Sequence, residues 1–229
     1  MSTSAAAPSS VPVYCSSDVS RHDSAESCWV SIATRGLVFD VTRLLSRGDE
    51  SGPLLALAGQ DVSHWFDESG LSVRSAVDPS TNARTAFTPD GRFPHIAPLA
   101  PSTEWAPDWE EPWWRDDSFV VGRLSRAPRR VVIVNSLTSH EHELDVGGEQ
   151  TVAEIATKYL AFNAHARGYT WKALDSASGR MRALDMDRTL EENGIENDAE
   201  ELEKLGLDTN DKHLLPVLLL EYKDTLTIA

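Results

Sequence analysis

The sequence lacks long apolar runs and has few cysteines. No stretch of about 18 apolar residues occurs, which predicts that no segment spans a membrane. The N-terminus has no basic region followed by an apolar core, so no secretory signal peptide is expected. The chain has two cysteines, Cys15 and Cys28, and the apolar pattern around Cys28 predicts a buried thiol. This cysteine usage favours a reducing, cytosol-like compartment.

The chain is also poor in positive charge. It has 36 acidic and 21 basic residues, and its formal net charge is -15. Phosphate groups repel such a surface, which argues against nucleic acid and anionic membranes as partners. The glycine-rich phosphate loop, the dinucleotide fingerprint and the G-x-S-x-G element are all missing from the sequence. We therefore predict a protein that is not an enzyme.

The order of predicted elements indicates an α+β protein with two domains. Residues 1–12 are small and polar, which predicts disorder. Residues 13–125 form the first predicted domain and residues 126–229 the second, joined by a basic linker at 126–130.

The first domain is predicted to begin with a short helix that ends near His22 and is capped by Ser16 or Ser17. Strands are expected at 28–32 and 37–42, a loop at 47–53, helical segments within 54–66 and a last strand at 118–125. Asp61 is expected to cap the second helical segment.

A proline- and tryptophan-rich segment interrupts this domain at residues 70–117. It holds seven of the 12 prolines and four of the seven tryptophans, and it is expected to be irregular. Exposing so many indole rings is unfavourable, so the segment should pack on something. Two alternatives remain open: a lid on its own domain, or an interface with another protein. The four tryptophans are Trp105, Trp109, Trp113 and Trp114.

The second domain has clear local signals. Thr151 followed by Glu154 forms a capping-box pattern before an amphipathic helix at 151–163. The last strand, at 214–222, is apolar on both faces, which predicts a central position in a sheet. The other predicted elements are strands at 129–138, 140–147, 169–174 and 181–186 and a short turn at 189–195.

Several motifs of the first domain resemble cytochrome b5. They are ESCWVSI at 26–32, VFDVTRLL at 38–45, AGQDVSHWF at 58–66 and FVVGRL at 119–124. The element order of the second domain resembles a ubiquitin-like β-grasp. Together the two domains resemble a family of cytochrome b5 domain-containing proteins of motile cilia, which belong to the radial-spoke stalk of the axoneme.

The resemblance implies a haem held between two histidines. In this sequence Gly48 and Leu71 occupy the places of those ligands, and neither can coordinate iron. His64 and His95 are weak substitutes, which are more readily explained as surface or packing residues. We therefore expect no cofactor under reducing conditions, with haem b bound through these histidines as the alternative.

Two smaller features are expected to be solvated. His140 and His142 alternate on one predicted strand face but lack a third ligand for zinc. The acidic stretch at 196–203 is typical of an exposed segment. The sequence ends in TLTIA without a Gly-Gly pair, so no ubiquitin-type conjugation is expected.

These patterns lead to one functional hypothesis and one rival. The resemblance implies a structural and interaction component of the ciliary axoneme whose partners are other axonemal or radial-spoke proteins. The rival is a haem-binding redox sensor or electron carrier of cilia.

Overall fold

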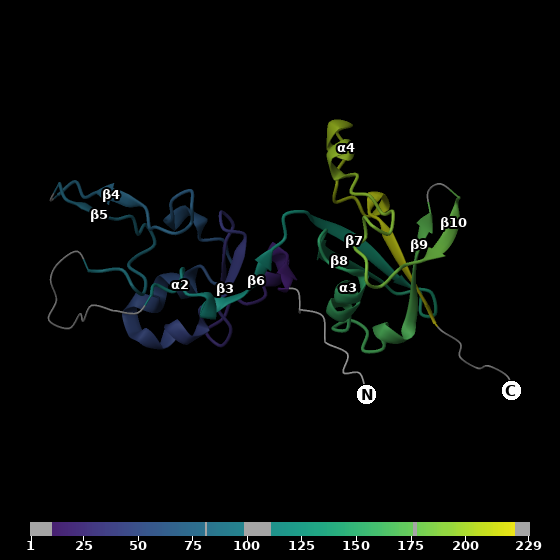
Figure 1. Ribbon diagram of the computed structural model, residues 1–229, viewed down its shortest axis with the longest axis horizontal. Coiled ribbons are helices and arrows are strands. Elements are labelled where there is room, and N and C mark those ends of the chain that lie inside the picture. The colour runs from purple at the N-terminus through teal and green to yellow at the C-terminus, as the bar shows by residue number, and fades with distance from the viewer. Residues whose placement is uncertain (1–10, 81, 99–110, 176–177, 223–229) are drawn as a thin grey trace, which may run out of the picture. The chain divides into compact units, whose positions relative to one another are not determined.

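The chain consists of two compact units. The computed structural model describes residues 11–80, 82–98, 111–175 and 178–222, and contacts group the chain into Met1–Leu124 and Ser125–Ala229 (Figure 1). Most of the segment predicted to be disordered lies outside the described residues. Its end does not fit that prediction, because the Pro12 carbonyl accepts a hydrogen bond from the Arg123 amide at 2.8 Å.

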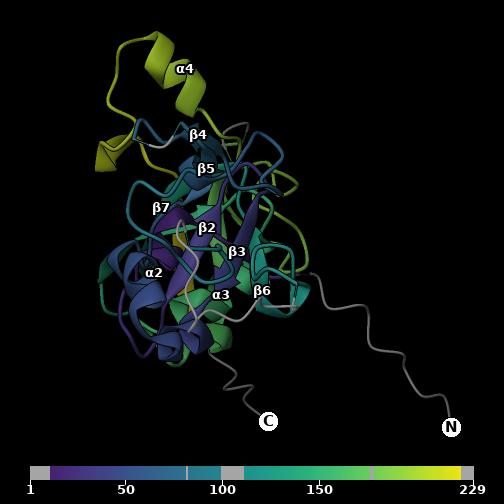
Figure 2. The same cartoon turned by 90° about the vertical axis from the view of Figure 1, so that its left-hand side faces the viewer.

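Unit 1 contains a four-stranded sheet in the order β1-β6-β3-β2 (Figure 2). The predicted hairpin is confirmed as β2 and β3, and β6 pairs with β3 from more than 80 residues away. Gly122 permits the close approach of β1, because a Cβ there would lie 2.5 Å from the Pro12 carbonyl oxygen. The strands are β1 (Val13–Tyr14), β2 (Trp29–Ile32), β3 (Leu37–Asp40) and β6 (Val120–Leu124).

The helices of unit 1 are short and differ from the predicted ones. The first is capped by Cys15 rather than by a serine, and Asp18 accepts a hydrogen bond from the Cys15 amide at 2.9 Å. The predicted loop at 47–53 is wrong, because this stretch is helical and carries Pro53 in the first turn of α2. The helices are α1 (Ser16–Val19), η1 (Thr42–Ser51), α2 (Gly52–Ala56), η2 (Ser63–Trp65) and η3 (Asp117–Phe119).

Asp61 does not cap a helix, contrary to prediction. Its carboxylate accepts hydrogen bonds from the Ala33 amide at 2.9 Å and from the Ser63 hydroxyl at 2.8 Å. The residue therefore joins the turn after β2 to the start of η2. The position of Asp61 just before a predicted helix suggested a cap. The amide that donates to its carboxylate is instead that of Ala33, in a turn 28 residues away.

The segment predicted to be irregular contains a regular hairpin. Strands β4 (Ser75–Val77) and β5 (Arg84–Ala86) pair antiparallel. Asp78 begins the turn and accepts a hydrogen bond from the Ser80 amide at 2.8 Å. Pro79 thus lies in the turn, where its missing N–H costs no strand pairing.

Unit 2 contains a five-stranded sheet in the order β10-β9-β11-β7-β8. β11 lies between β7, to which it is parallel, and β9, to which it is antiparallel, so its predicted central position is confirmed. No separate linker spans 126–130, because β7 already begins at Pro128. The strands are β7 (Pro128–Asn135), β8 (Glu141–Gly147), β9 (Tyr169–Asp175), β10 (Arg180–Ala183) and β11 (Val217–Tyr222).

One helix, α3 (Val152–Tyr159), supplies the apolar partner of this sheet. The predicted capping box is confirmed: the Thr151 hydroxyl accepts from the Glu154 amide at 3.2 Å, and the Glu154 carboxylate accepts from the Thr151 amide at 2.8 Å. The helix ends four residues before the predicted end. The remaining helices are η4 (Ala166–Gly168), α4 (Ala199–Lys204), which buries no residue, and η5 (Lys212–Leu214).

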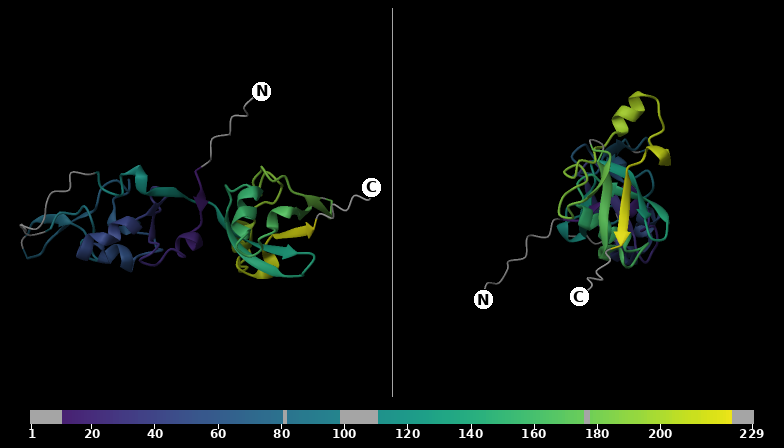
Figure 3. Two further views of the ribbon diagram at one scale, coloured as in Figure 1. Left: turned by 90° about the horizontal axis from the view of Figure 1, so that it is seen from below. Right: turned by 90° about the vertical axis from the view of Figure 1, so that its right-hand side faces the viewer.

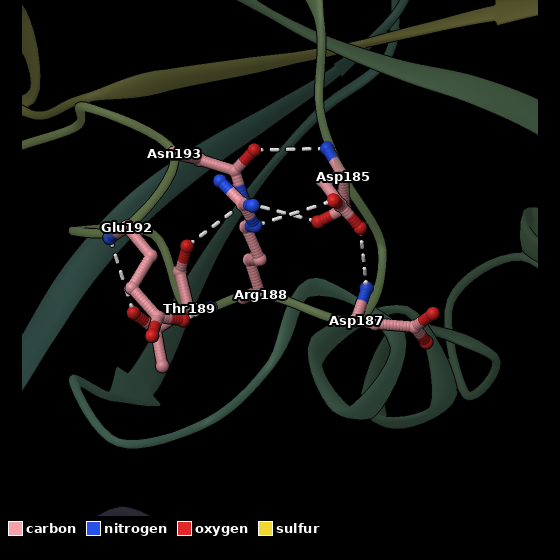
Figure 4. Close-up of polar contacts among 6 residues, drawn as sticks. All are labelled: Asp185, Asp187, Arg188, Thr189, Glu192 and Asn193. Atoms are coloured by element: carbon pink, nitrogen blue, oxygen red, sulfur yellow. Dashed lines mark hydrogen bonds and ion pairs between the residues drawn. The ribbon is translucent and has the colours of Figure 1, made fainter.

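The predicted turn before the last strand is organised by a buried asparagine (Figure 4). The Asn193 side chain donates to the carbonyls of Asp185 at 3.0 Å and Thr189 at 2.8 Å, and it accepts from the Asp185 amide at 2.8 Å. Arg188 forms an ion pair with Asp185 at 3.3 Å. Polar groups of the turn, together with Arg182 of β10, which donates to the Asn193 carbonyl, therefore hold this turn.

Two findings concern the whole described chain. The predicted burial of the Cys28 thiol is confirmed, and both Cys15 and Cys28 are free and buried. Among the residues that the structure describes, no helix is both long enough and apolar enough to cross a membrane.

The capping box yields a test of the second unit. Thr151→Ala removes an acceptor for an otherwise unpaired helix amide and should lower the free energy of unfolding by about 1 kcal/mol. Thr157→Ala is the matched control, because this exposed threonine lies within α3 and alanine favours a helix. Urea denaturation of the full chain measures both variants. Equal stabilities would contradict the capping role.

Candidate functional site

The two places expected to ligate iron carry no ligand side chain. Gly48 lies within η1, and Leu71 lies in the turn between Phe66 and Val73, which form an isolated bridge. The Leu71 side chain is 43% exposed. The backbone carbonyl of Leu71 makes hydrogen bonds to the end of the inserted segment.

Asp67 holds the Leu71 turn from within. Its carboxylate accepts from the Ser69 hydroxyl at 2.6 Å and from the amides of Leu71 at 3.3 Å and Ser72 at 3.4 Å. These hydrogen bonds, that of Ser69 first, lower the pKa of Asp67 below its usual value. The Asp67 carboxylate therefore holds the turn through three hydrogen bonds within residues 67–72.

The end of the inserted segment binds the same turn from outside. The Leu71 carbonyl accepts from Trp114 Nε1 at 3.2 Å and from Arg115 Nε at 2.8 Å. Arg35 donates to the Trp114 carbonyl. Residues 111–115 therefore lie against the place where the resemblance implies the second axial ligand.

An aromatic cluster fills the adjoining core of unit 1. Three of its rings come from β3, η2 and the residue that follows η2, and three come from the inserted segment. All six side chains are buried, Trp113 with 0% of its surface exposed. We call this set the aromatic plug: Phe39, Trp65, Phe66, Phe93, Trp113 and Trp114.

The rings of the aromatic plug are in direct contact. Phe93 stacks on Trp65 with centroids 4.4 Å apart, and Trp113 meets Phe39 edge-on at 5.5 Å. Trp114 lies 5.6 Å from Phe66 and 5.7 Å from Trp113. Burying an aromatic side chain of about 150–250 Å² contributes roughly 4–6 kcal/mol as an upper estimate. The inserted segment is thus a major part of the core.

The two tryptophans differ in their polar atoms. Trp114 Nε1 has a carbonyl acceptor, whereas Trp113 Nε1 is buried without a hydrogen-bond partner. An unpaired buried donor costs about 1–3 kcal/mol. Trp113 therefore stabilises the core through its ring alone.

The substitute histidines are both engaged elsewhere. His64 is largely exposed, and its Nε2 lies 3.0 Å from an Asp90 oxygen that also accepts from Trp65 Nε1 at 2.8 Å. The hydrogen bond from Trp65 is the main cause that lowers the pKa of Asp90. His95 Nδ1 accepts from the Trp113 amide at 3.0 Å. Each imidazole thus takes part in a hydrogen bond beside the aromatic plug, that of His64 with Asp90 and that of His95 with the Trp113 amide.

The described residues do not fit a haem held by two histidines. The expected places offer no donor atom, and the aromatic plug occupies the apolar core beside the second one. Desolvation raises the pKa of the free Cys28 thiol to about 11.

The remaining predicted sites resolve in different ways. Among the described residues, no group of three or more potential metal-ligating side chains exists. His142 is not solvated as predicted, because Nδ1 lies 2.9 Å from the Tyr159 hydroxyl on the inner face of the sheet.

Trp113 and Trp114 pack inside their own unit, so the lid alternative holds for them. Trp105 and Trp109 lie outside the described residues.

Sequence reasoning missed Phe93 and Asp90. Phe93 lies at the centre of the aromatic plug and follows Gly91, whose φ of +108° forms a turn that favours glycine. The run GRFP carries this signal, because glycine and proline bracket a single aromatic residue. Asp90 was not predictable, since its partners are 25 and 26 residues away.

The unequal polar environments of the two tryptophans predict unequal effects. Trp113→Phe and Trp114→Phe remove the same atoms, but the first removes an unpaired donor and the second a hydrogen bond. Trp114→Phe should therefore be more destabilising by at least about 1 kcal/mol. Thermal or urea unfolding measures the difference. The reverse order would show that Trp113 Nε1 has a partner.

A third variant tests the packing itself. Trp113→Ala should cost about 3–5 kcal/mol, because it leaves a large cavity among rigid rings. Unchanged stability would contradict internal packing of this residue.

Comparison with known proteins gives a family model and a solved structure that match parts of the chain. Residues 16–89 match the family model described as "Cytochrome b5-like Heme/Steroid binding domain". The chain is also similar in part to a solved structure, the C-terminal ubiquitin-like domain of mouse tubulin-specific chaperone e. The identity is 15%, the TM-score is 0.31, and the match covers 42% of this chain and 88% of that one.

Curated relatives match almost the whole chain. Cytochrome b5 domain-containing protein 1 of Mus musculus is 42% identical over 214 residues, which is 92% of this chain and 90% of the relative. The Homo sapiens protein of the same name is 41% identical over 213 residues, which is 92% of this chain and 89% of the relative. With identities above 40% and coverage of about nine tenths of both chains, this chain belongs to the cytochrome b5 domain-containing protein 1 family.

Proposed function

We propose that the protein is a non-enzymatic structural and interaction component of the ciliary axoneme, located in the radial-spoke stalk, where it supports coordinated beating. The observation that carries the proposal is the aromatic plug. It fills the apolar core of the cytochrome b5-like unit with the chain's own side chains, beside an exposed Leu71 at one expected ligand place. A domain built in this way supplies surfaces and a rigid frame rather than redox chemistry.

The ciliary part of the proposal rests on the family resemblance of the two-domain arrangement. The net charge of -15 disfavours phosphate-rich partners, and protein partners are consistent with it. A ubiquitin-like unit offers a sheet face and edges to such partners.

A rival function is a conditional haem-binding redox sensor or electron carrier. The matched family model, described as heme- or steroid-binding, favours it. This function would require the aromatic plug to open, and His64 and His95 to exchange their present hydrogen bonds for iron.

Spectroscopy separates the two functions. Full-length protein in reducing buffer, titrated with haem, should lack the sharp low-spin bands of bis-histidine ligation at a one-to-one ratio, because both substitute histidines are engaged. The variant carrying His64→Ala and His95→Ala should give the same spectrum as the unchanged protein. A bis-histidine cytochrome b5 serves as the positive control. Stoichiometric low-spin bands that disappear in the variant would establish the rival.

Fractionation of cilia tests the location. A tagged full-length protein expressed in ciliated cells should remain with the axoneme after detergent removes the membrane, because the proposed contacts are with the cytoskeleton. A tagged ciliary membrane protein should be released under the same conditions. Release of the tagged chain into the detergent fraction, or its absence from cilia, would overturn the axonemal proposal.

A further inference from the structure

One long connection of unit 2 contains no buried residue. It comprises residues 196–214, between the turn organised by Asn193 and β11, and it includes α4 and η5. In the right-hand view of Figure 3, α4 stands apart from the strands of its own unit. The predicted exposure of the acidic stretch at 196–203 is thus confirmed. We call residues 196–214 the acidic arm. Connections in compact domains have a median of about 4–6 residues, so an excursion of this length that adds nothing to the core needs another explanation.

Both ends of the acidic arm are fixed to unit 2. Arg129 of β7 donates from Nη1 to the carbonyls of Ile195 at 2.9 Å and of Glu196 at 3.0 Å, where the arm begins. Near the other end, Lys212 forms an ion pair with Glu141 of β8. The arm is therefore presented from two fixed points.

The middle of the acidic arm is ordered by its own backbone. The Leu207 amide donates to the Leu202 carbonyl at 2.9 Å, and the Gly206 amide donates to the Glu203 carbonyl at 2.9 Å. Gly206 has a φ of +71°, so these two hydrogen bonds form the glycine-ended cap that terminates many helices. A short helix draws most of its stability from packing, yet α4 buries no side chain. Its apolar side is left for another molecule.

Three leucines at the end of α4 form this apolar side. Leu205 is 73% exposed and Leu207 is 45% exposed. Leu202 is partly exposed and lies three residues before Leu205, on the same side of the helix. The cap brings Leu207 back toward Leu202. We call these three residues the leucine tip. A group of neighbouring exposed aliphatic side chains indicates an interaction surface, whereas scattered single ones do not.

Charge selects the partner of the leucine tip. The acidic arm has seven acidic and two basic residues. Lys204 pairs with Glu200 at 3.9 Å, and Lys212 pairs with an acid outside the arm. Glu201 and Glu203 are exposed within α4 itself. Phosphate-rich molecules and a second copy of this acidic chain are repelled by such a segment, and a basic protein segment is attracted.

The acids of the arm are not gathered for a metal ion. Within residues 11–80, 82–98, 111–175 and 178–222, no three potential metal ligands lie together. Divalent cations such as Ca²⁺ need several oxygens around one point. The acids of the arm are instead spread from residue 196 to residue 211. This spacing matches the separate positive charges of a protein better than a single ion.

We propose that the acidic arm docks a basic segment of a partner protein. The leucine tip packs against aliphatic side chains of that segment, and its lysines or arginines lie beside Glu201 and Glu203. The inference rests on the proposed interaction function and assigns a surface to it. Burial of the leucines supplies affinity, and the charges attract the basic partner and discriminate against acidic ones. Because both ends of the arm are already fixed, docking costs less conformational entropy.

Amide signals of the full-length, ¹⁵N-labelled protein test the proposal. The probe is a short peptide in which leucines lie between lysines. Two matched peptides carry glutamine in place of either the leucines or the lysines. The probe should shift the amides of residues 199–207 more than those of unit 1. Each matched peptide should bind at least about tenfold more weakly, because it retains only one of the two attractions.

A leucine variant locates the apolar contact. Leu205→Gln should weaken binding of the probe about tenfold, as loss of a buried leucine does. Leu174→Gln is the matched control, because Leu174 is 62% exposed and lies on β9, outside the arm. Both side chains are exposed, so the fold should persist, which circular dichroism checks. Leu174→Gln should bind the probe like the unchanged protein.

Two charge variants separate local attraction from that of the acidic chain as a whole. Glu201→Gln with Glu203→Gln removes two exposed acids of α4, and Glu26→Gln with Glu68→Gln removes two exposed acids of unit 1. The two double variants have the same net charge. The first should bind the probe about threefold to tenfold more weakly and with less dependence on salt. The second should bind like the unchanged protein.

Several results would overturn the proposal. They are absence of binding by the probe, equal binding of the three peptides, unchanged binding by Leu205→Gln and equal weakening by the two charge variants. Shifts of the same amides with protein concentration, without peptide, would identify a second copy of the chain as the occupant and also overturn it. Retention of the tagged chain in the axoneme is measured independently, so failure of this surface is distinguishable from failure of the proposed function.

Discussion

Closure of the first unit depends on aromatic contact between segments that are distant in the sequence. Phe39, Trp65 and Phe66 come from the frame shared with cytochrome b5, and the inserted segment places Phe93, Trp113 and Trp114 against them. Without the insertion, the frame would expose three large aromatic surfaces. The same contact packs the core beside Leu71, the place where the family resemblance implies the second axial ligand.

The polar contacts around the aromatic plug hold the two ends of the insertion. Arg35 and Arg115 bind backbone carbonyls at Trp114 and Leu71, and Arg43 lies over the Phe119 ring at 3.5 Å. His95 accepts the Trp113 amide. Guanidinium groups donate to several acceptors at once, so few side chains suffice to fix an irregular backbone. This explains how a proline-rich segment without regular structure at its end still buries two tryptophans.

Features coded by neighbouring residues were predictable, and features set by distant ones were not. The Thr151 capping box and the central position of β11 follow from residue types within a few positions. The burial of Trp113 and Trp114 was also predictable from their chemistry, but their destination was not, because Phe39 lies more than 70 residues away. Asp61 was assigned wrongly for the same reason: its backbone partner, Ala33, belongs to another turn. The hairpin of β4 and β5 was missed because prolines around it masked two short strands.

The two units deal with apolar surface in opposite ways. Unit 1 covers its open aromatic frame with its own insertion, and its expected ligand place at Leu71 becomes a backbone anchor for Trp114. Unit 2 covers one sheet face with α3 and pairs the strand acids of the other face with Lys172, Lys212 and Arg130. Three bases serve four strand acids on this face, so it stays slightly acidic, in keeping with the net charge of -15 of the whole chain.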